Sequence, residues 1–194
     1  MTHTCLAHDG HCRILILILI MARLTHVLVL LSCVLLRALC CDWLRRYGAL
    51  SDRCLSLVQV LGHPVEDRDS PLPFPRGLYK LARKSEVACK MAFVRDSLGH
   101  ILDLYQEVDD TAAGWDADRT EELLVVLHRQ KDEVAGCVSP GNSTCSFAEP
   151  LQRYYRTLAA AALNRTAGSN ASWELVRGES KLHLQQLHLL VAAM

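Results

Sequence analysis

Residues 169–190 read SNASWELVRGESKLHLQQLHLL, and this stretch decides the fold because its apolar side chains recur at helical spacing. They form one stripe roughly 100° wide, which must be buried against other helices. The stripe consists of Trp173, Val176, Leu184, Leu187 and Val191. The polar side chains favour the opposite face, where they either meet solvent or contact a partner. They are Glu174, Arg177, Glu179, Lys181, Gln185 and Gln186.

Apolar residues also recur every three and four positions earlier in the chain, which predicts helices for the last one to pack against. We expect these helices at residues 42–61, 77–84, 85–108, 118–136 and 146–163. Capping boxes are expected to begin two of them, Asp118 with Glu121 and Ser146 with Glu149. Residues 62–76 form a long loop because four prolines exclude regular structure, and residues 164–172 form a polar turn. No stretch alternates with period two, so the sequence predicts an all-α bundle of five to six helices.

The N-terminus has the layout of a secretory signal. An apolar run at residues 27–36 follows Arg23, and Ala38 and Cys40 are the small residues before a cleavage site at Cys41. We therefore expect residues 1–40 to be an N-terminal extension and signal peptide, and residues 41–194 to be the helical domain. A second apolar run at residues 14–21 leaves a membrane anchor as the alternative, and Met21 is an alternative start of translation.

Secretion changes the meaning of the cysteines, because an oxidising compartment permits disulfides. Five cysteines follow Cys40, and this odd number leaves at least one without a partner in the chain. They are Cys41, Cys54, Cys89, Cys137 and Cys145. Three glycosylation sequons are expected in exposed loops, at Asn142, Asn164 and Asn170.

Several classes of function are not supported by the sequence. The 21 basic and 21 acidic residues balance, and no basic run points to nucleic acid. The histidines are scattered and no nucleophile elbow or paired carboxylates occur, so an enzyme, the rival class, is not expected. Cys5, His8, His11 and Cys12 have spacings that suggest zinc, but they lie in the segment expected to be removed. We therefore expect no metal and no cofactor.

Five short motifs resemble those of type I interferons in order and spacing, over the whole chain after Cys40. They are CDW at residues 41–43, FP at 74–75, GWD at 114–116, GCV at 136–138 and ASWELVR at 171–177. The CDW start and the CVSP segment are most similar to the two-cysteine group of bony-fish type I interferons. This resemblance implies the fold of a four-helix-bundle cytokine with a long first crossover and an additional short helix.

The resemblance implies a secreted, monomeric antiviral cytokine that bridges two class II cytokine receptor chains and signals through receptor-bound kinases. One chain would contact the first loop and the last helix. These contacts are Glu66, Asp67, Arg68, Arg177, Lys181, Leu182 and Gln185. The other receptor chain would lie near Lys80, Lys84, Arg95 and His100. The alternatives are another helical cytokine, with class I receptors, and a membrane-anchored or intracellular isoform.

The resemblance also implies a disulfide between Cys41 and Cys137. A second bridge of the family, from the first loop to the residue before the last motif, is absent because neither place has a cysteine. Cys137 paired with Cys145 is the alternative, and Cys89 and Cys145 are left to pair with each other or between chains. Cys54 is expected to be an inert, buried thiol. For Arg177, the alternative to receptor contact is an ion pair with Glu174 in the same helix.

Overall fold

The computed structural model describes residues 17, 19–30, 43–62, 72–106, 113–138, 145–166 and 170–194. The chain divides into two compact units, Met1–Cys41 and Asp42–Met194. In the first unit, residues 19–30 are helical and their side chains are exposed. Among the described residues, no helix combines the length and the apolar character needed to cross a bilayer. Cleavage before Cys41 stays a prediction, and the segment from Cys5 to Cys12 lies outside the described residues.

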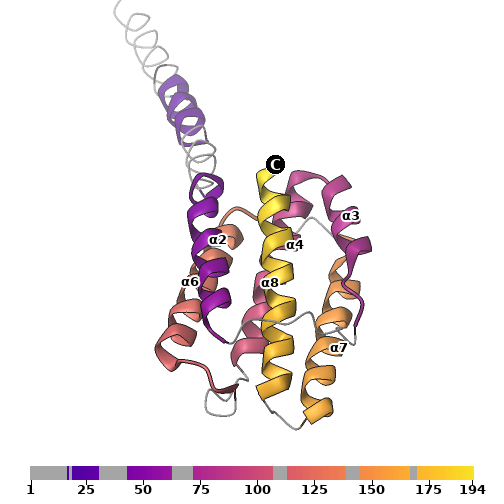
Figure 1. Ribbon diagram of the computed structural model, residues 1–194. Helices are drawn as coiled ribbons and strands as arrows, with labels where there is room; N and C mark the ends of the chain where they lie inside the picture. Colours follow the sequence, from indigo (N-terminus) through magenta and orange to yellow (C-terminus); the bar gives the residue numbers. More distant parts are fainter. Residues whose placement is uncertain are drawn as a thin grey trace, which may run out of the picture. The chain divides into compact units, whose positions relative to one another are not determined.

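The second unit is all-α, as the sequence predicts, and its described residues contain no strand. Its helices are labelled in Figure 1. They are α2 (Trp43–Val60), α3 (Arg76–Lys84), α4 (Val87–Gln106), α6 (Ala117–Ala135), α7 (Ala148–Thr166) and α8 (Asn170–Ala192). The long first crossover and the additional short helix α3 are therefore both present.

The last helix packs against four others. α8 packs against α2 on one side and α7 on the other, and it also contacts α4 and the short α3 (Figure 1). α6 packs against α2 and α4. Because four helices surround α8, most of its circumference is covered, and this decides which of its side chains can reach the surface.

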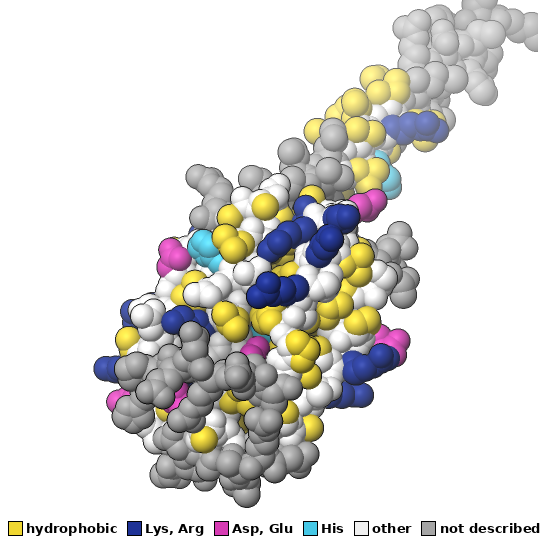
Figure 2. All heavy atoms as spheres, turned by 45° about the vertical axis from the view of Figure 1, so that its right-hand side comes forward, with side chains coloured by type: hydrophobic (Ala, Val, Ile, Leu, Met, Phe, Trp, Pro, Cys, Tyr) yellow, Lys and Arg dark blue, Asp and Glu magenta, His cyan; other side chains and the backbone are white. Residues whose placement is uncertain are grey.

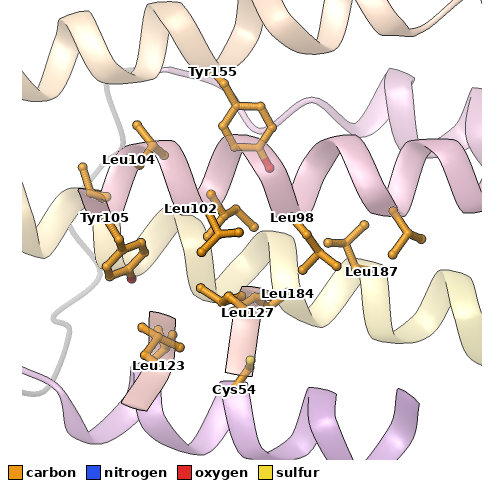
Figure 3. Packing of buried hydrophobic residues seen from close by; sticks show 14 of the residues in the cluster. Cys54, Leu98, Leu102, Leu104, Tyr105, Leu123, Leu127, Tyr155, Leu184 and Leu187 are labelled. Atoms are coloured by element: carbon orange, nitrogen blue, oxygen red, sulfur yellow. The ribbon is translucent and has the colours of Figure 1, made fainter. Parts of the chain in front are cut away.

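The core is built from the inward faces of the long helices. Figure 3 shows side chains from several of them meeting around Leu98, Leu127 and Leu184. The apolar stripe expected on the last helix is confirmed, since all five of its members are buried. Helical periodicity places Val87 first on the apolar stripe of the helix expected at residues 85–108. This position is wrong, because Val87 begins α4 and is 48% exposed. Trp115 and Trp173, large aromatic residues near the starts of α6 and α8, are both buried in the core.

Several predicted helix boundaries are corrected by the structure. α6 begins at Ala117, one residue earlier than expected, and its N-cap lies two residues earlier than expected. Asp116, not Asp118, is the N-cap, and its Oδ1 accepts a hydrogen bond from the Arg119 amide at 3.0 Å. Gly114 precedes this cap with φ 67°, in the left-handed region that favours glycine. The polar turn expected at residues 164–172 is shorter, since α7 runs to Thr166 and α8 begins at Asn170. The alanines at residues 159–162 are strong helix formers, which favours continuation of α7.

Candidate functional site

The surface of α8 is a narrow strip and not the broad polar face that the sequence suggests. Exposed side chains recur along it at Leu182, Gln185 and Leu189, and the two leucines are 45% and 54% exposed. Two of the expected polar-face residues are instead buried, Arg177 at 1% and Glu179 at 4% exposure. The physical reason is the packing of α2, α3, α4 and α7 around α8, which covers polar positions together with apolar ones.

Arg177 is the main correction to the predicted contact set. Its guanidinium pairs with Glu174 in the preceding turn, with Nε and Nη2 at 2.9 and 2.5 Å from Oε2. Its Nη1 donates to the backbone carbonyl oxygen of Val58 at 2.9 Å. The alternative expected for this residue, an ion pair within the helix, is therefore present. A buried charge must be paired and hydrogen-bonded, and these contacts meet that requirement.

The Glu174–Arg177 pair joins three parts of the chain. Trp115, just before α6, donates from Nε1 to the other carboxylate oxygen of Glu174 at 3.1 Å. Gly62, just after α2, lies so close that a Cβ atom there would be 2.1 Å from Glu174 Oε1 and 2.8 Å from Arg177 Nε. The ion pair thus connects the end of α2 and the segment before α6 to α8.

The other residues predicted to contact the receptor differ in exposure, and some lie outside the described residues. Leu182 and Gln185 are exposed and Lys181 is half-buried. The loop residues Glu66, Asp67 and Arg68 lie outside the described residues. Gly62 is the last described residue before that loop, so the loop leaves α2 beside the Glu174–Arg177 pair.

A second polar group is buried inside the bundle at His183. A hydrogen bond of 2.7 Å joins its Nδ1 to Tyr79 Oη, which connects α8 to the short α3. Four aromatic rings lie within ring contact of the imidazole: Phe74, Tyr79, Tyr154 and Tyr155. Burial among these rings lowers the pKa of His183 to about 3. The imidazole is therefore neutral at physiological pH and serves as a packing and hydrogen-bonding group.

The cysteines follow the predictions in part. Cys89 and Cys145 form a disulfide, which ties α4 to the segment before α7 and excludes a bond between Cys137 and Cys145. Cys54 is free and buried, as expected, and burial raises its pKa to about 12. Cys137 is disulfide-bonded. Its pairing with Cys41 stays a prediction because Cys41 lies outside the described residues.

A shallow, open hollow of about 540 Å³ also lies between α4, α6 and α7. His100 lines it and stacks on Tyr155, with ring centroids 5.0 Å apart, and desolvation lowers the pKa of its imidazole. Charged side chains of both signs surround the hollow, including Arg95, Asp103 and Lys131. No group of three or more potential metal ligands occurs among the described residues.

Comparison with known proteins connects this bundle to one family. The chain is 33% identical to interferon a3 of Oncorhynchus mykiss over 156 residues, which cover 80% of this chain and 87% of that protein. The chain belongs to the type I interferon family. Its structure is similar to that of zebrafish interferon 1, with a TM-score of 0.69, 28% identity, and coverage of 78% of this chain and 98% of that one. No protein-family model matches the chain.

Membership of this family makes the chain a cytokine and not an enzyme. The resemblance found in the five short motifs is confirmed at the level of the family. Membership of the two-cysteine group is not confirmed. The resemblance implies a single disulfide, Cys41–Cys137, whereas the structure contains the Cys89–Cys145 disulfide.

Proposed function

We propose that this interferon is secreted and that it induces antiviral signalling by bridging two class II cytokine receptor chains whose associated kinases act inside the cell. The proposal rests on the family membership and on one surface, the exposed strip of α8. A monomer bound to one copy of each receptor chain is the expected assembly.

The observation that carries the proposal is the exposure of Leu182 and Leu189 on a helix whose other large apolar side chains are buried or half-buried. The two leucines lie seven residues, or about two helical turns, apart with Gln185 between them, and they form an apolar strip bordered by polar groups. An apolar centre with a polar border is the arrangement found in protein interfaces, where a few residues supply most of the binding energy. We therefore propose Leu182 as the anchor, with Lys181 and Gln185 as neighbouring contacts.

Arg177 has a different role in this proposal from the one that the resemblance implies. Its side chain is 2% exposed, so it cannot form the first contact with a receptor. It instead holds α8 against the end of α2, from which the loop with Glu66, Asp67 and Arg68 continues. We propose that Arg177 positions the strip and the loop relative to each other, and that the three loop residues contact the same receptor chain.

Two further features belong to the same proposal. We infer that cleavage exposes Cys41, which pairs with Cys137, and that Cys89–Cys145 is an addition to this bond of the two-cysteine group. Glycans are proposed at Asn142, Asn164 and Asn170. Asn164 lies in the last turn of α7 and Asn170 begins α8, in contrast to the loops expected for them, and Asn142 lies outside the described residues.

The test compares Leu182→Asp with Val125→Asp. Val125 lies on α6 and is 59% exposed, so the same change is made at an exposed apolar position away from α8. Leu182→Asp is expected to weaken binding to one interferon receptor ectodomain by at least about tenfold, the effect of losing an anchor. Val125→Asp is expected to bind within about threefold of wild type.

Circular dichroism and thermal unfolding show whether both variants are folded as the wild type is. Equal affinities for Leu182→Asp and wild type, with both proteins folded, would remove the α8 strip from the receptor interface. Absence of wild-type binding to any class II receptor chain would instead contradict the bridging function.

A further inference from the structure

The short helix α3 is strongly positive, although the chain as a whole has no net charge. Its nine residues, RGLYKLARK, contain four basic side chains and no acidic one. These are Arg76, Lys80, Arg83 and Lys84, and all four are exposed. With about 100° between successive residues of a helix, they fall within one stripe roughly 100° wide and about 12 Å long.

The opposite face of α3 fixes this stripe in place. Tyr79 and Ala82 are 1% and 0% exposed, and Tyr79 is hydrogen-bonded to His183 of α8. Arg83 donates from Nη2 to Gln186 Oε1 at 2.7 Å. Because glutamine is uncharged, this hydrogen bond does not neutralise the positive charge of Arg83. Among the described residues, none of the four basic side chains forms an ion pair. Figure 2 shows Lys and Arg side chains gathered at the height of α3 on the face turned forward.

We propose that the α3 stripe, defined as Arg76, Lys80, Arg83 and Lys84, binds a sulfated polysaccharide of the cell surface or extracellular matrix. A linear polyanion places sulfate groups at intervals along its length, and a row of cations on a rigid helix can contact several of them at once. Charge-assisted hydrogen bonds from guanidinium and ammonium groups to such oxyanions are the strong class of polar contact. Basic clusters of this kind are typical of heparin-binding patches.

The other polyanionic surface in reach of a secreted protein is an anionic membrane, and the structure disfavours it. A helix that lies on a membrane inserts its apolar face into the lipid. The apolar face of α3 is already used, because Tyr79 and Ala82 are packed in the core. Leu81, at 41% exposure, is the one apolar side chain of α3 among the exposed large hydrophobic residues described.

This inference goes beyond receptor binding, and it rests on the proposed function only in taking the protein to be secreted. Lys80 and Lys84 also lie near the surface that the resemblance assigns to the second receptor chain, so polysaccharide and that chain would compete for them. Binding is therefore tested with the purified protein alone, without receptor.

The experiment measures binding of the full secreted chain to immobilised heparin, a highly sulfated polysaccharide, in about 0.15 M salt. Wild type is compared with a variant carrying Arg76→Gln, Lys80→Gln, Arg83→Gln and Lys84→Gln. The variant is expected to bind at least about tenfold more weakly, and wild-type binding is expected to fall steeply as salt is raised. A Lys80→Arg, Lys84→Arg variant, which keeps the charge, is expected to bind like the wild type.

A control variant changes four exposed arginines outside α3 to glutamine: Arg53, Arg129, Arg153 and Arg156. It alters the net charge by the same amount and is expected to retain binding within about threefold. Equal losses in the two four-site variants would overturn the proposal, because net charge alone would then explain binding. Undiminished binding to heparin lacking sulfate, or binding to phosphatidylserine vesicles and not to heparin, would overturn it as well.

Discussion

Arg177 Nη1 donates to the backbone carbonyl oxygen of Val58 at 2.9 Å, and this hydrogen bond joins residues 119 positions apart in the sequence. The same guanidinium pairs with Glu174, which accepts a hydrogen bond from Trp115. Arg177, which the sequence suggests as a surface residue that contacts a receptor, therefore lies inside the bundle and connects α2 to α8.

Replacing Arg177 alone tests this connection. Arg177→Met leaves the Glu174 carboxylate, whose side chain is 15% exposed, without its cationic partner. The free energy of unfolding is expected to fall by about 3 kcal/mol, in the range measured when one partner of a buried pair is removed. Urea unfolding measures this.

The double variant Arg177→Met, Glu174→Gln removes both charges and is expected to be more stable than Arg177→Met alone. If the two variants unfold at the same urea concentration, the carboxylate is not held by the guanidinium, and the proposed positioning role fails.

Gly62 provides a steric test of the same region. A Cβ atom at residue 62 would lie 2.1 Å from Glu174 Oε1, so Gly62→Ala must displace the carboxylate or the end of α2. We expect Gly62→Ala to lower the free energy of unfolding by about 1–3 kcal/mol, the usual cost of overpacking.

Gly48 is the matched control, because it lies inside α2 and an added Cβ there meets nothing within 4 Å. Gly48→Ala is expected to stabilise the protein by about 0.5–1 kcal/mol through helix propensity. A neutral Gly62→Ala variant would mean that the close approach to Glu174 is absent in solution.

The disulfide between Cys89 and Cys145 closes a loop with a sequence separation of 56. A Cys89→Ala, Cys145→Ala variant is expected to be about 2–4 kcal/mol less stable, because the unfolded chain gains conformational freedom. Thermal unfolding measures this loss of stability. Cys54→Ala is the comparison, because it removes a cysteine side chain without breaking the Cys89–Cys145 disulfide.

Cys54→Ala removes a buried free thiol whose Sγ accepts a hydrogen bond from Gln130, and a smaller loss of about 1 kcal/mol is expected. Non-reduced peptide mapping supplies a direct check. Recovery of Cys89 linked to any cysteine except Cys145 would contradict the structure.

The stability of the bundle is expected to fall in mild acid because of His183. Its pKa is about 3 in the folded protein against an ordinary value of 6.5, so below pH 6.5 the unfolded chain binds a proton that the folded protein does not. The contribution of His183 is fully present above pH 6.5 and declines as the pH falls toward 3. From pH 7 to pH 5 the loss is about 2 kcal/mol.

Urea unfolding at several pH values between 7 and 5 checks this, with His183→Gln as the comparison. The variant is expected to show a smaller decrease, because glutamine does not titrate. Identical pH dependence in the two proteins would show that His183 is not held neutral by burial. His100, whose pKa is also lowered, contributes equally to both curves.

Helical periodicity predicts most of the fold, and its main failure is the exposed face of α8. The apolar stripe of α8 is correct because apolar side chains can be placed only in the core. The exposed face is wrong at Arg177 because periodicity gives the direction of a side chain and not the width of the buried arc. That width depends on how many helices surround α8, and four do so.

The cysteines illustrate a second limit. Burial of Cys54 is predictable from its place on an apolar stripe. The partner of Cys89 is not, because several cysteines allow several pairings and only the fold brings α4 close to the segment before α7. For Arg177, the available signal is Glu174 three residues earlier, which a helix places within reach.

The most direct test of the proposed function mixes the purified secreted chain with the ectodomains of the two interferon receptor chains of the same animal and measures the mass of the complex. We expect a complex of one cytokine with one copy of each receptor chain, and its loss at the same concentrations with Leu182→Asp but not with Val125→Asp. A mixture in which the wild-type chain stays unbound, or binds only class I receptor ectodomains, would contradict the account.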